Sequence, residues 1–461
     1  MVAFGGRKCT IESFSSELEL FKDPAAIYLA LRDAKPSFLF ESKENTKSGR
    51  YSLIGINPKV TIEGDARVTG EGAIAELAAS ALEADPLNSL KRFFSRIECK
   101  DPQALAAGFL SYDYVRLIEK LPDRHKSTGE PSAFLMLLPD LISVDHFESK
   151  ITIHTFGDGA EEKAGEIAAR IYAAEGIKTA FKETKPVQCR ANTTKEQYIS
   201  SVDAAKEYIR AGDAVQVVLS KRFEAEFKKD PFRAYLALRK INPSPYLYYL
   251  ETEDLKIAGS SPETLVKVQG GEAYTRPIAG TAKRGVTEKE DLELERQLLT
   301  DEKELAEHAM LVDLARNDLG KVCEYGSVSV SELMKVQRFS HVQHITSTVK
   351  GKPNKDCFDT LRACFPAGTV SGAPKIRAMQ IIDELEQEKR GIYAGCVGYF
   401  TNSGDMDTAI AIRTIVFREG KAFIQAGAGI VADSVPEKEN QEAENKAKAM
   451  MLALEMAEGA E

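Results

Sequence analysis

The spacing of apolar and polar residues changes along this 461-residue chain. In residues 1–185, SFLFES and YSLIGINPKVTIEG are rich in aromatic and branched side chains and predict strands, whereas GEIAARIYAAEGI predicts a helix closed by a glycine. AGFLSYDYVRLIEKL predicts a strand that leads into a helix. The polar segment KETKPVQCRANTT then indicates a linker, so we expect residues 1–185 to form an N-terminal domain.

Residues 192–457 predict a second domain. Thr193 and Thr194 stand three residues before Glu196 and Gln197, which is the spacing of a capping box and predicts a helix start. Apolar strands follow, namely AVQVVLSKRF, YLYYLE, LKIAGS, VGYF and AIAIRTIVF. Short turns such as NSGD and REGK separate strands and favour antiparallel pairing. The pattern therefore predicts an α+β fold with antiparallel sheets.

Composition excludes several classes of protein. A net charge of −9, with no basic run carrying interleaved aromatic residues, argues against a nucleic-acid partner. The chain has no apolar stretch of membrane-spanning length and its first residues lack the apolar core of a signal peptide, so we expect no membrane association. Seven scattered cysteines without a C-x-x-C motif predict reduced thiols and a cytoplasmic location.

Two pairs of glutamates are the first candidates for chemistry. Glu304 and Glu307 in DEKELAEHAMLVDLARNDLG, and Glu439 and Glu442 near the C-terminus, each stand at i and i+3 and share a helix face. Four carboxylates from two helices would suit Mg²⁺, whereas the motifs of zinc and di-iron sites are missing from both helices. The alternative is two solvated faces, with Glu442 and Lys446 forming an exposed pair worth about 0.3–0.5 kcal/mol.

The glycines of QAGAGIVADS invite a second interpretation. Gly427 and Gly429 fit the dinucleotide pattern G-x-G-x-x-A after a strand. The following helix, however, is predicted to start at Ser434, whose capping box ends at Glu437, and too little chain remains for a second strand. We therefore reject dinucleotide binding and expect the glycine amides to bind an anion.

Three further segments carry polar groups suited to a site. RPIAGTAKRG (276–285) and FPAGTVSGAPKIRAM (365–379) predict Gly/Pro loops that each offer a threonine. In a strand, His341 and His344 would lie on opposite faces, so at most one should face a site. Arg413 stands in the apolar strand AIAIRT, where a buried guanidinium requires an anionic partner such as a carboxylate.

Together these motifs resemble the chorismate-binding family. The resemblance covers essentially the whole chain and is densest between residues 200 and 455, where QVVLS, GSSPE, RPIAGT, HVQHI, FPAGTVSGAPK, GYF, AIAIRT and ENKAKAM follow in order. It implies a two-domain α+β fold with two packed, roughly orthogonal antiparallel sheets flanked by helices. The site would lie in a cleft and bind chorismate.

The resemblance assigns roles to the candidate residues. It implies that Glu307 and Glu442 bind Mg²⁺ and that Glu304 and Glu439 hold its waters. Contacts to chorismate are implied for Gly280, Thr281, Thr369, Tyr399, Arg413, Gly427, Gly429 and Lys446. Glu263 would be the general acid for the leaving C4 hydroxyl, and His344 would serve the pyruvate-eliminating step. Chorismate is a dianion, so Lys446 and Arg413 would offset its charge.

Two positions select a branch of the family. Water-using members carry a lysine where this chain has Gln216, and a neutral amide cannot act as that base, which favours ammonia as the nucleophile. Aminodeoxychorismate synthases carry a lysine where this chain has Ala279, which favours direct attack. The implied products are anthranilate and pyruvate, in tryptophan biosynthesis. Aminodeoxychorismate or aminodeoxyisochorismate synthesis, and a non-catalytic tryptophan-binding subunit, remain as alternatives.

The resemblance also implies a regulatory site and a partner. Tryptophan would bind between the segment of Glu41 and Ser42 and a second segment, NPSPYL, that comprises Asn242, Pro243, Ser244, Pro245, Tyr246 and Leu247. Leu247 stands where the family often has methionine, a change that keeps volume and polarity. The chain has no glutaminase motif, so ammonia is expected from a separate glutamine amidotransferase subunit.

Overall fold

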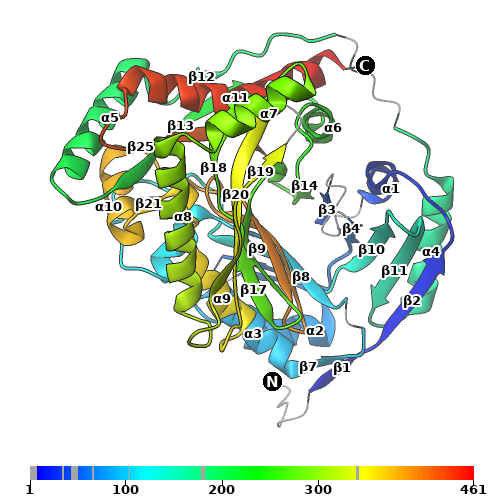
Figure 1. The fold of residues 1–461 in the computed structure, drawn as a ribbon. Coiled ribbons are helices and arrows are strands. Elements are labelled where there is room, and N and C mark those ends of the chain that lie inside the picture. Colours follow the sequence, from blue (N-terminus) through cyan, green and yellow to red (C-terminus); the bar gives the residue numbers. More distant parts are fainter. Residues whose placement is uncertain are drawn as a thin grey trace.

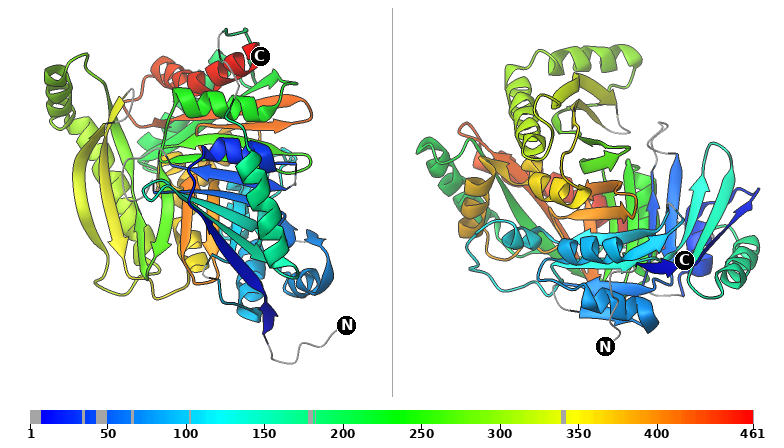
Figure 2. Two further views of the ribbon diagram at one scale, coloured as in Figure 1. Left: turned by 90° about the vertical axis from the view of Figure 1, so that its right-hand side faces the viewer. Right: turned by 90° about the horizontal axis from the view of Figure 1, so that it is seen from below.

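The computed structural model describes residues 8–33, 36–42, 50–64, 67–101, 103–177, 181, 183–338 and 342–460. Two large antiparallel sheets form its centre (Figures 1 and 2). Phe38, Tyr248 and Val416 of one sheet pack with Phe109 and Val397 of the other in a shared apolar cluster, so the sheets bury their facing sides against each other. The predicted α+β fold with packed antiparallel sheets is confirmed.

Within the described residues, the first sheet has twelve strands. In spatial order they are β12 (Arg190–Ala191), β13 (Gln216–Glu226), β25 (Lys421–Ile430), β24 (Thr414–Arg418), β15 (Lys256–Ser261), β14 (Tyr246–Glu251), β3 (Ser37–Glu41), β4 (Tyr51–Ile56), β10 (Asp140–Asp145), β11 (Lys150–Phe156) and β2 (Ser13–Leu18), with β21 (Gly372–Ala373) also paired to β13. The strands predicted from AVQVVLSKRF, YLYYLE and LKIAGS are confirmed as β13, β14 and β15.

The second sheet has eleven described strands. In order they are β18 (Ile278–Lys283), β20 (Val342–Gly351), β17 (Glu272–Thr275), β16 (Thr264–Gln269), β23 (Met406–Ile410), β22 (Cys396–Thr401), β8 (Leu105–Leu110), β9 (Ala133–Leu137), β5 (Val60–Glu63) and β6 (Arg67–Gly70), with β19 (Ser329–Arg338) also paired to β20. A small parallel pair joins β1 (Cys9–Ile11) and β7 (Ile97–Cys99).

Both sheets contain strands from both predicted domains. β3 pairs with β14 in the first sheet, and β8 pairs with β22 in the second. The blue and cyan strands therefore lie beside green and orange ones (Figures 1 and 2). A division near residues 185–192 stays a prediction about chain organisation, and the hydrogen-bonded sheets run across it.

Helices cover the outer sides of the sheets. They are α1 (Pro24–Leu31), α2 (Gly72–Ser80), α3 (Pro86–Arg96), the 3-10 helix η2 (Tyr112–Leu117), α4 (Ala160–Ala173), α5 (Lys195–Arg210), α6 (Pro231–Ile241), α7 (Glu288–Leu298), α8 (Glu302–Gly320), α9 (Cys357–Cys364), the 3-10 helix η3 (Gly368–Val370), α10 (Lys375–Leu385) and α11 (Pro436–Gly459). α11 lies along β25, and α8 lies against β18 and β20 (Figure 1). These two helices carry the glutamate pairs.

Local signals in the sequence account for several of these elements. The predicted capping box starts α5, where the Thr194 hydroxyl accepts from the Gln197 amide and the Gln197 side chain accepts from the Thr194 amide. REGK turns β24 into β25, with Glu419 and Gly420 at φ 51° and 73°, as a tight hairpin turn requires. Seven free thiols are present. Among the described helices none is long and apolar enough to cross a membrane.

Four local predictions were wrong. The predicted capping box of the last helix does not form: Val435 precedes α11, and the Ser434 hydroxyl instead accepts from the Val431 amide. Residues 278–283 form strand β18 because they pair with β20. The helix α4 ends at Ala173, before the predicted glycine. The run AIAIRTIVF breaks into two strands, and Arg413 lies between them at φ 52°.

Candidate active site

Elements from both sheets converge on the predicted site. β13 and β25 come from the first sheet, and β18 and β20 come from the second. The first turns of α8 and α11 lie near each other. Lys303 at the start of α8 is close enough for its charge to lower the pKa of Glu439 at the start of α11. Two distant parts of the chain thus bring their glutamate-bearing first turns to one region.

Glu263 has the properties of a general acid. It lies between β15 and β16, and only 6% of its surface is exposed. Burial raises the pKa of this carboxyl to about 8, although the Thr369 hydroxyl, the Ile278 amide and the charge of Lys446 each lower it. Glu263 is therefore mostly protonated at neutral pH and can donate a proton.

Thr369 belongs to the same part of the site. It lines a small pocket together with Glu263, between α8 and the segment that precedes α10. Its hydroxyl oxygen is buried and makes no well-formed hydrogen bond to the described residues, although it lies close enough to Glu263 to lower the pKa of that carboxyl. Since the hydroxyl can both donate and accept, it retains capacity for a further hydrogen bond, and a ligand atom would be a favourable neighbour.

Each helix presents its two carboxylates as a separate pair. On α8, Gln216 of β13 donates a hydrogen bond of 3.1 Å from Nε2 to Oε1 of Glu307. Burial and the charge of Glu307 raise the pKa of Glu304. On α11, burial raises the pKa of Glu439, and Glu442 adds to the rise. The carboxylates within each pair repel one another, and a cation would relieve that repulsion.

The structure does not unite the four glutamates into one cluster. Among the described residues, no three His, Cys, Asp or Glu side chains lie together as a metal-binding group. Mg²⁺ typically uses one or two carboxylates with water and substrate oxygens, and both pairs offer only hard oxygen ligands. The donor chemistry therefore fits Mg²⁺, but Mg²⁺ binding by Glu304, Glu307, Glu439 and Glu442 stays a prediction.

Two cations stand beside these carboxylates. Lys446 lies 2.7 Å from Glu442 through Nζ and Oε1, and its Nζ donates to the Gly427 carbonyl at 3.1 Å. Arg413 is half-buried, and burial lowers its pKa. Its guanidinium makes no side-chain hydrogen bond or ion pair in the described part of the chain. Arg413 lies in the break between β23 and β24, and its charge acts on His344 of the site.

His344 is held as a neutral base. On β20, its Nδ1 lies 3.0 Å from the Gly280 carbonyl oxygen and 3.0 Å from the Thr281 hydroxyl. Burial lowers the pKa of His344, and the charges of Arg413 and Lys446 lower it further. A carbonyl oxygen can only accept, so Nδ1 carries the proton and Nε2 is the basic nitrogen. His341 lies outside the described residues.

Glycines allow the close approach of these groups. Gly280 has φ +73° at a bulge in β18, and a Cβ there would lie 3.0 Å from Ile345 and 3.3 Å from the Glu304 carboxylate. A Cβ on Gly429 would lie 2.6 Å from the Gln216 amide, and one on Gly427 would meet the β13 backbone. That their amides bind an anion stays a prediction.

Tyr399 lies on β22 of the second sheet. It packs against the apolar cluster between the sheets and is paired across β22 and β23 with Asp407. Burial raises its pKa, with Asp407 contributing, so the phenol stays protonated. The structure thus connects Glu263 with Thr369, Gln216 with Glu307, His344 with Gly280 and Thr281, and Lys446 with Glu442 and Gly427.

Comparison with known proteins identifies the family. The family model described as chorismate binding enzyme matches residues 16–452. The chain belongs to the chorismate-binding enzyme family. It is 45% identical to anthranilate synthase component 1 of Aquifex aeolicus, over 94% of this chain and 92% of that protein. It is 42% identical to the Pseudomonas aeruginosa protein of the same name, over 95% of this chain and 94% of that protein.

Solved structures of chorismate-binding relatives have the same fold. The chain is similar to anthranilate synthase component I from Streptococcus pneumoniae, with a TM-score of 0.74 and 36% identity, over 89% of this chain and 94% of that one. The menaquinone-specific isochorismate synthase of Escherichia coli has a TM-score of 0.76 at 20% identity, over 97% and 95% of the two chains, and shares the fold alone.

The two segments predicted to bind tryptophan lie side by side. Glu41, at the end of β3, is paired with Leu247 at the start of β14. The Glu41 carboxylate is buried and accepts hydrogen bonds from Tyr235 and, at 2.7 Å, from Arg239. Ser42 is the last described residue before 43–49, which lie outside the description.

The second segment is tied to its surroundings by polar contacts. Asn242 binds Ser260, with 3.3 Å between Nδ2 and Oγ, and Ser244 donates to the Asn242 carbonyl at 3.4 Å. Pro243 and Pro245 form the connection between α6 and β14, and the Tyr246 hydroxyl contacts Thr264 and Asp407. Tryptophan binding by this chorismate-binding chain stays a prediction.

Sequence reasoning missed one buried cation near the site. Arg390 follows α10 in the polar run LEQEKRG, which has the pattern of a solvent-facing segment. Its guanidinium is nevertheless buried and bonds to the backbone of two separate segments. No local signal distinguishes it from the neighbouring Lys389, because only long-range packing buries it.

Proposed function

We propose that this chain is the aminating subunit of anthranilate synthase, a lyase that converts chorismate and ammonia to anthranilate, pyruvate and water. The observation that carries the proposal is Glu263, a buried carboxyl whose pKa of about 8 keeps it protonated at neutral pH. Hydroxide is a poor leaving group, so replacing the C4 hydroxyl requires such an acid. The names of the relatives support the same activity.

In the first step, ammonia attacks C2 of chorismate, the two conjugated ring double bonds each shift by one position, and the C4–O bond breaks. Glu263 gives its proton to the departing hydroxyl, which leaves as water. The amine nitrogen loses one proton, and this restores the proton balance. Gln216 supports ammonia as the nucleophile, because its neutral amide donates to Glu307 and cannot deprotonate water.

In the second step, the C2 proton is removed and the C3–O bond breaks. The enolpyruvyl group leaves and takes up a proton to become pyruvate, while the ring becomes aromatic. We assign the base to His344, since its Nδ1 proton is held by Gly280 and its depressed pKa keeps Nε2 unprotonated. Retention of the aminated intermediate until this step distinguishes anthranilate synthesis from release of aminodeoxyisochorismate.

Binding of the chorismate dianion requires positive charge. Arg413 has no ion-pair partner among the described residues and is suited to a carboxylate, and Lys446 can exchange its contact with Glu442 for one with the substrate. Glu304, Glu307, Glu439 and Glu442 would hold Mg²⁺, which when bound supplies positive charge for a substrate carboxylate. Gly280, Thr281, Thr369, Tyr399, Gly427 and Gly429 would line the remainder of the site.

The proposal extends to a partner and a regulator. The relatives' designation as component 1 supports a second component, and we propose a glutamine amidotransferase subunit that supplies ammonia. We also propose feedback inhibition by tryptophan, which would bind between Glu41–Ser42 and residues 242–247. The pairing of β3 with β14, which brings these segments together, supports this location.

Anthranilate fluorescence tests the proposal directly. The purified chain is supplied with chorismate, Mg²⁺ and excess ammonium, then with EDTA, and then with tryptophan. We expect a signal that EDTA abolishes and tryptophan suppresses. Consumption of chorismate without anthranilate would indicate an aminodeoxy or isochorismate product instead. Unchanged chorismate, even with a cognate glutaminase added, would favour a non-catalytic tryptophan-binding subunit.

A further inference from the structure

The segment that carries Thr369 is held on β13 by the backbone pairing of β21 and, next to that pairing, by one buried side chain. This segment, residues 365–374, connects α9 to α10. Arg390 donates from Nη1 to the Val370 carbonyl at 2.7 Å, and from Nη2 to the Val218 carbonyl at 2.7 Å. Val218 stands two residues after Gln216 on β13, so both point to the same face of the sheet. Arg390 therefore connects the segment of Thr369 with the strand of Gln216.

Arg390 is itself fixed in place. Only 2% of its surface is exposed, and Glu386 binds it in a bidentate pair, at 2.9 Å from Nε and 2.6 Å from Nη2. The Glu386 carboxylate also accepts from the amide and the hydroxyl of Ser220, both at 2.8 Å. The rings of Tyr112 and Tyr393 flank the guanidinium, with centroids 4.8 and 5.6 Å away. With these hydrogen bonds and ring contacts, the planar guanidinium has little freedom to move.

We propose that Arg390, held by Glu386, is a positioning residue of the active site, which fixes Thr369 against Glu263 and Gln216 against Glu307. The inference rests on the proposed function. Because Arg390 acts through backbone carbonyls, its loss should shift the reacting groups without removing any of them. Lysine carries the same charge but has no fork, so it cannot hold both carbonyls and Glu386 at once.

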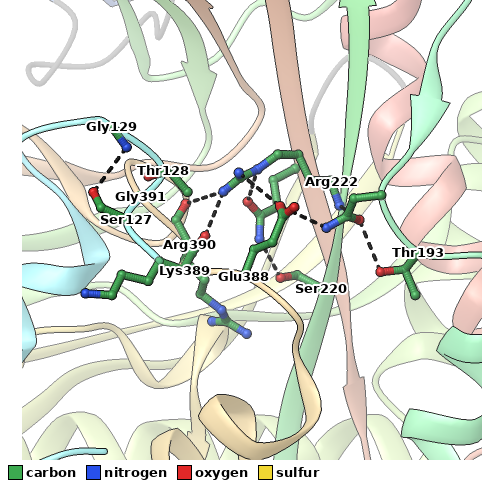
Figure 3. Close-up of polar contacts among 12 residues, drawn as sticks. Ser127, Thr128, Gly129, Thr193, Ser220, Arg222, Glu388, Lys389, Arg390 and Gly391 are labelled. Atoms are coloured by element: carbon green, nitrogen blue, oxygen red, sulfur yellow. Dashed lines mark hydrogen bonds and ion pairs between the residues drawn. The ribbon is translucent and has the colours of Figure 1, made fainter. Parts of the chain in front are cut away.

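Arg222 provides a matched control. It lies beside Arg390 and Ser220 (Figure 3). It also donates to a backbone carbonyl, that of Lys389, at 2.8 Å, and it pairs with Glu388 at 3.2 Å. It also donates to the Arg390 carbonyl at 3.4 Å, but none of its side-chain hydrogen bonds to the described residues reaches the segment of Thr369 or residues 216–218. Arg222→Lys therefore makes the same chemical change in the same neighbourhood without loosening the site.

Steady-state kinetics gives the first test. Arg390→Lys should lower kcat about tenfold or more while KM for chorismate stays within about twofold, because positioning acts on the chemical step. Arg222→Lys should leave both within about twofold. Equal effects of the two substitutions, or an Arg390→Lys effect confined to KM, would overturn the proposal.

The pH dependence of kcat gives a second test, because a general loss of stability would not shift the pH at which kcat falls. The Thr369 hydroxyl lowers the pKa of Glu263, so Thr369→Val should shift the basic limb of kcat to higher pH. Arg390→Lys should shift it in the same direction, and the double variant should shift it no further. The other charged groups near Glu263 are Lys446, and Asp318 paired with Lys375, and all three remain in every variant. Additive shifts, or none, would contradict the proposal.

Two further measurements keep the test decisive. If Arg390→Lys does not fold, Glu386→Gln weakens the hold on the Arg390 guanidinium while changing only one carboxylate to an amide. It should shift the basic limb of kcat to higher pH and lower kcat in the same way. NMR of ¹³C-carboxyl-labelled glutamate titrates Glu263 without turnover, with Glu263→Gln assigning the signal. Wild type that makes no anthranilate would refute the proposed function, whereas an unchanged Glu263 titration in the Arg390 and Glu386 variants would refute the positioning role alone.

Discussion

At the scale of single residues, burial decides what each polar group can do. Glu263 and Glu253 have identical side chains, but Glu253 lies exposed in a turn and Glu263 lies between the sheets. Loss of solvation makes Glu263 a proton donor and makes His344 a neutral base. An acid with a raised pKa and a base with a lowered pKa suit successive protonation and deprotonation steps.

We expect Glu263→Gln to lower the turnover number about 10²–10⁴-fold, because an amide cannot protonate the leaving hydroxyl. Chorismate affinity should stay within about threefold, since the cations remain. Anthranilate fluorescence and isothermal titration with chorismate measure the two quantities. Glu253→Gln is the control and should behave as wild type. Substantial turnover by Glu263→Gln would remove Glu263 from the role of general acid.

The same residue makes a prediction about stability. Its folded-state pKa of about 8 lies above the unfolded value of 4.5, so the folded state binds more protons between these values. The free energy of unfolding therefore falls as pH rises through this window, by up to about 1.4 kcal/mol per pH unit from this group. In urea denaturation, the free energy of unfolding of Glu263→Gln should rise relative to that of wild type between pH 5 and 8. Above pH 8 the difference should stay constant. A pH-independent difference would contradict the buried, protonated state.

At the scale of elements, helix starts place the carboxylates. Asp301 caps α8 and accepts from the amides of Lys303 and Glu304, at 3.0 and 3.2 Å. α11 lacks such a side-chain cap, and Pro436 begins it instead. The i and i+3 spacing that the sequence displays thus becomes a shared face only once each helix start is fixed.

We expect Asp301→Ala to lower the free energy of unfolding by about 1 kcal/mol, because two amides at the start of α8 lose their acceptor. Asp301→Asn retains a capping oxygen and should stay within about 0.5 kcal/mol of wild type. Urea denaturation followed by circular dichroism gives both values. If the two substitutions cost the same, the cap does not hold the helix start.

At the scale of the whole molecule, a tyrosine connects the two sheets. Tyr246 of the first sheet places its hydroxyl 2.8 Å from the Thr264 hydroxyl and 2.9 Å from the Asp407 carboxylate, both of the second sheet. Thr264 adjoins Glu263, and Asp407 is paired with Tyr399. This polar bridge crosses an otherwise apolar interface and fixes how the sheets are placed.

We expect Tyr246→Phe to lower the free energy of unfolding by about 1–3 kcal/mol, because it leaves buried acceptors unsatisfied. Turnover should fall as well, since Thr264 directly follows the proposed general acid Glu263 in the chain. Tyr248→Phe is the control: its hydroxyl binds Thr414 within the first sheet at 2.6 Å, so it should leave turnover near wild type. Equal losses of turnover would contradict a role for the bridge.

Sequence alone determined several of the elements and the candidate site residues of this protein. Apolar, β-branched runs predicted β13, β14 and β15, and the Thr194 capping box predicted the start of α5, because these signals act between near neighbours in the chain. The order of motifs also identified the family. The spacing of Glu304 and Glu307 showed a shared face, but it could not show whether that face was solvated.

Only the tertiary structure decided how the candidates act. It paired Gln216 with Glu307, moved Arg413 out of its predicted strand, and buried Glu263 until its pKa reached about 8. It also buried Arg390 behind Thr369, 172 residues from its partner Val218. Solvation and hydrogen bonding depend on which distant segments come into contact, and local sequence patterns do not predict those contacts.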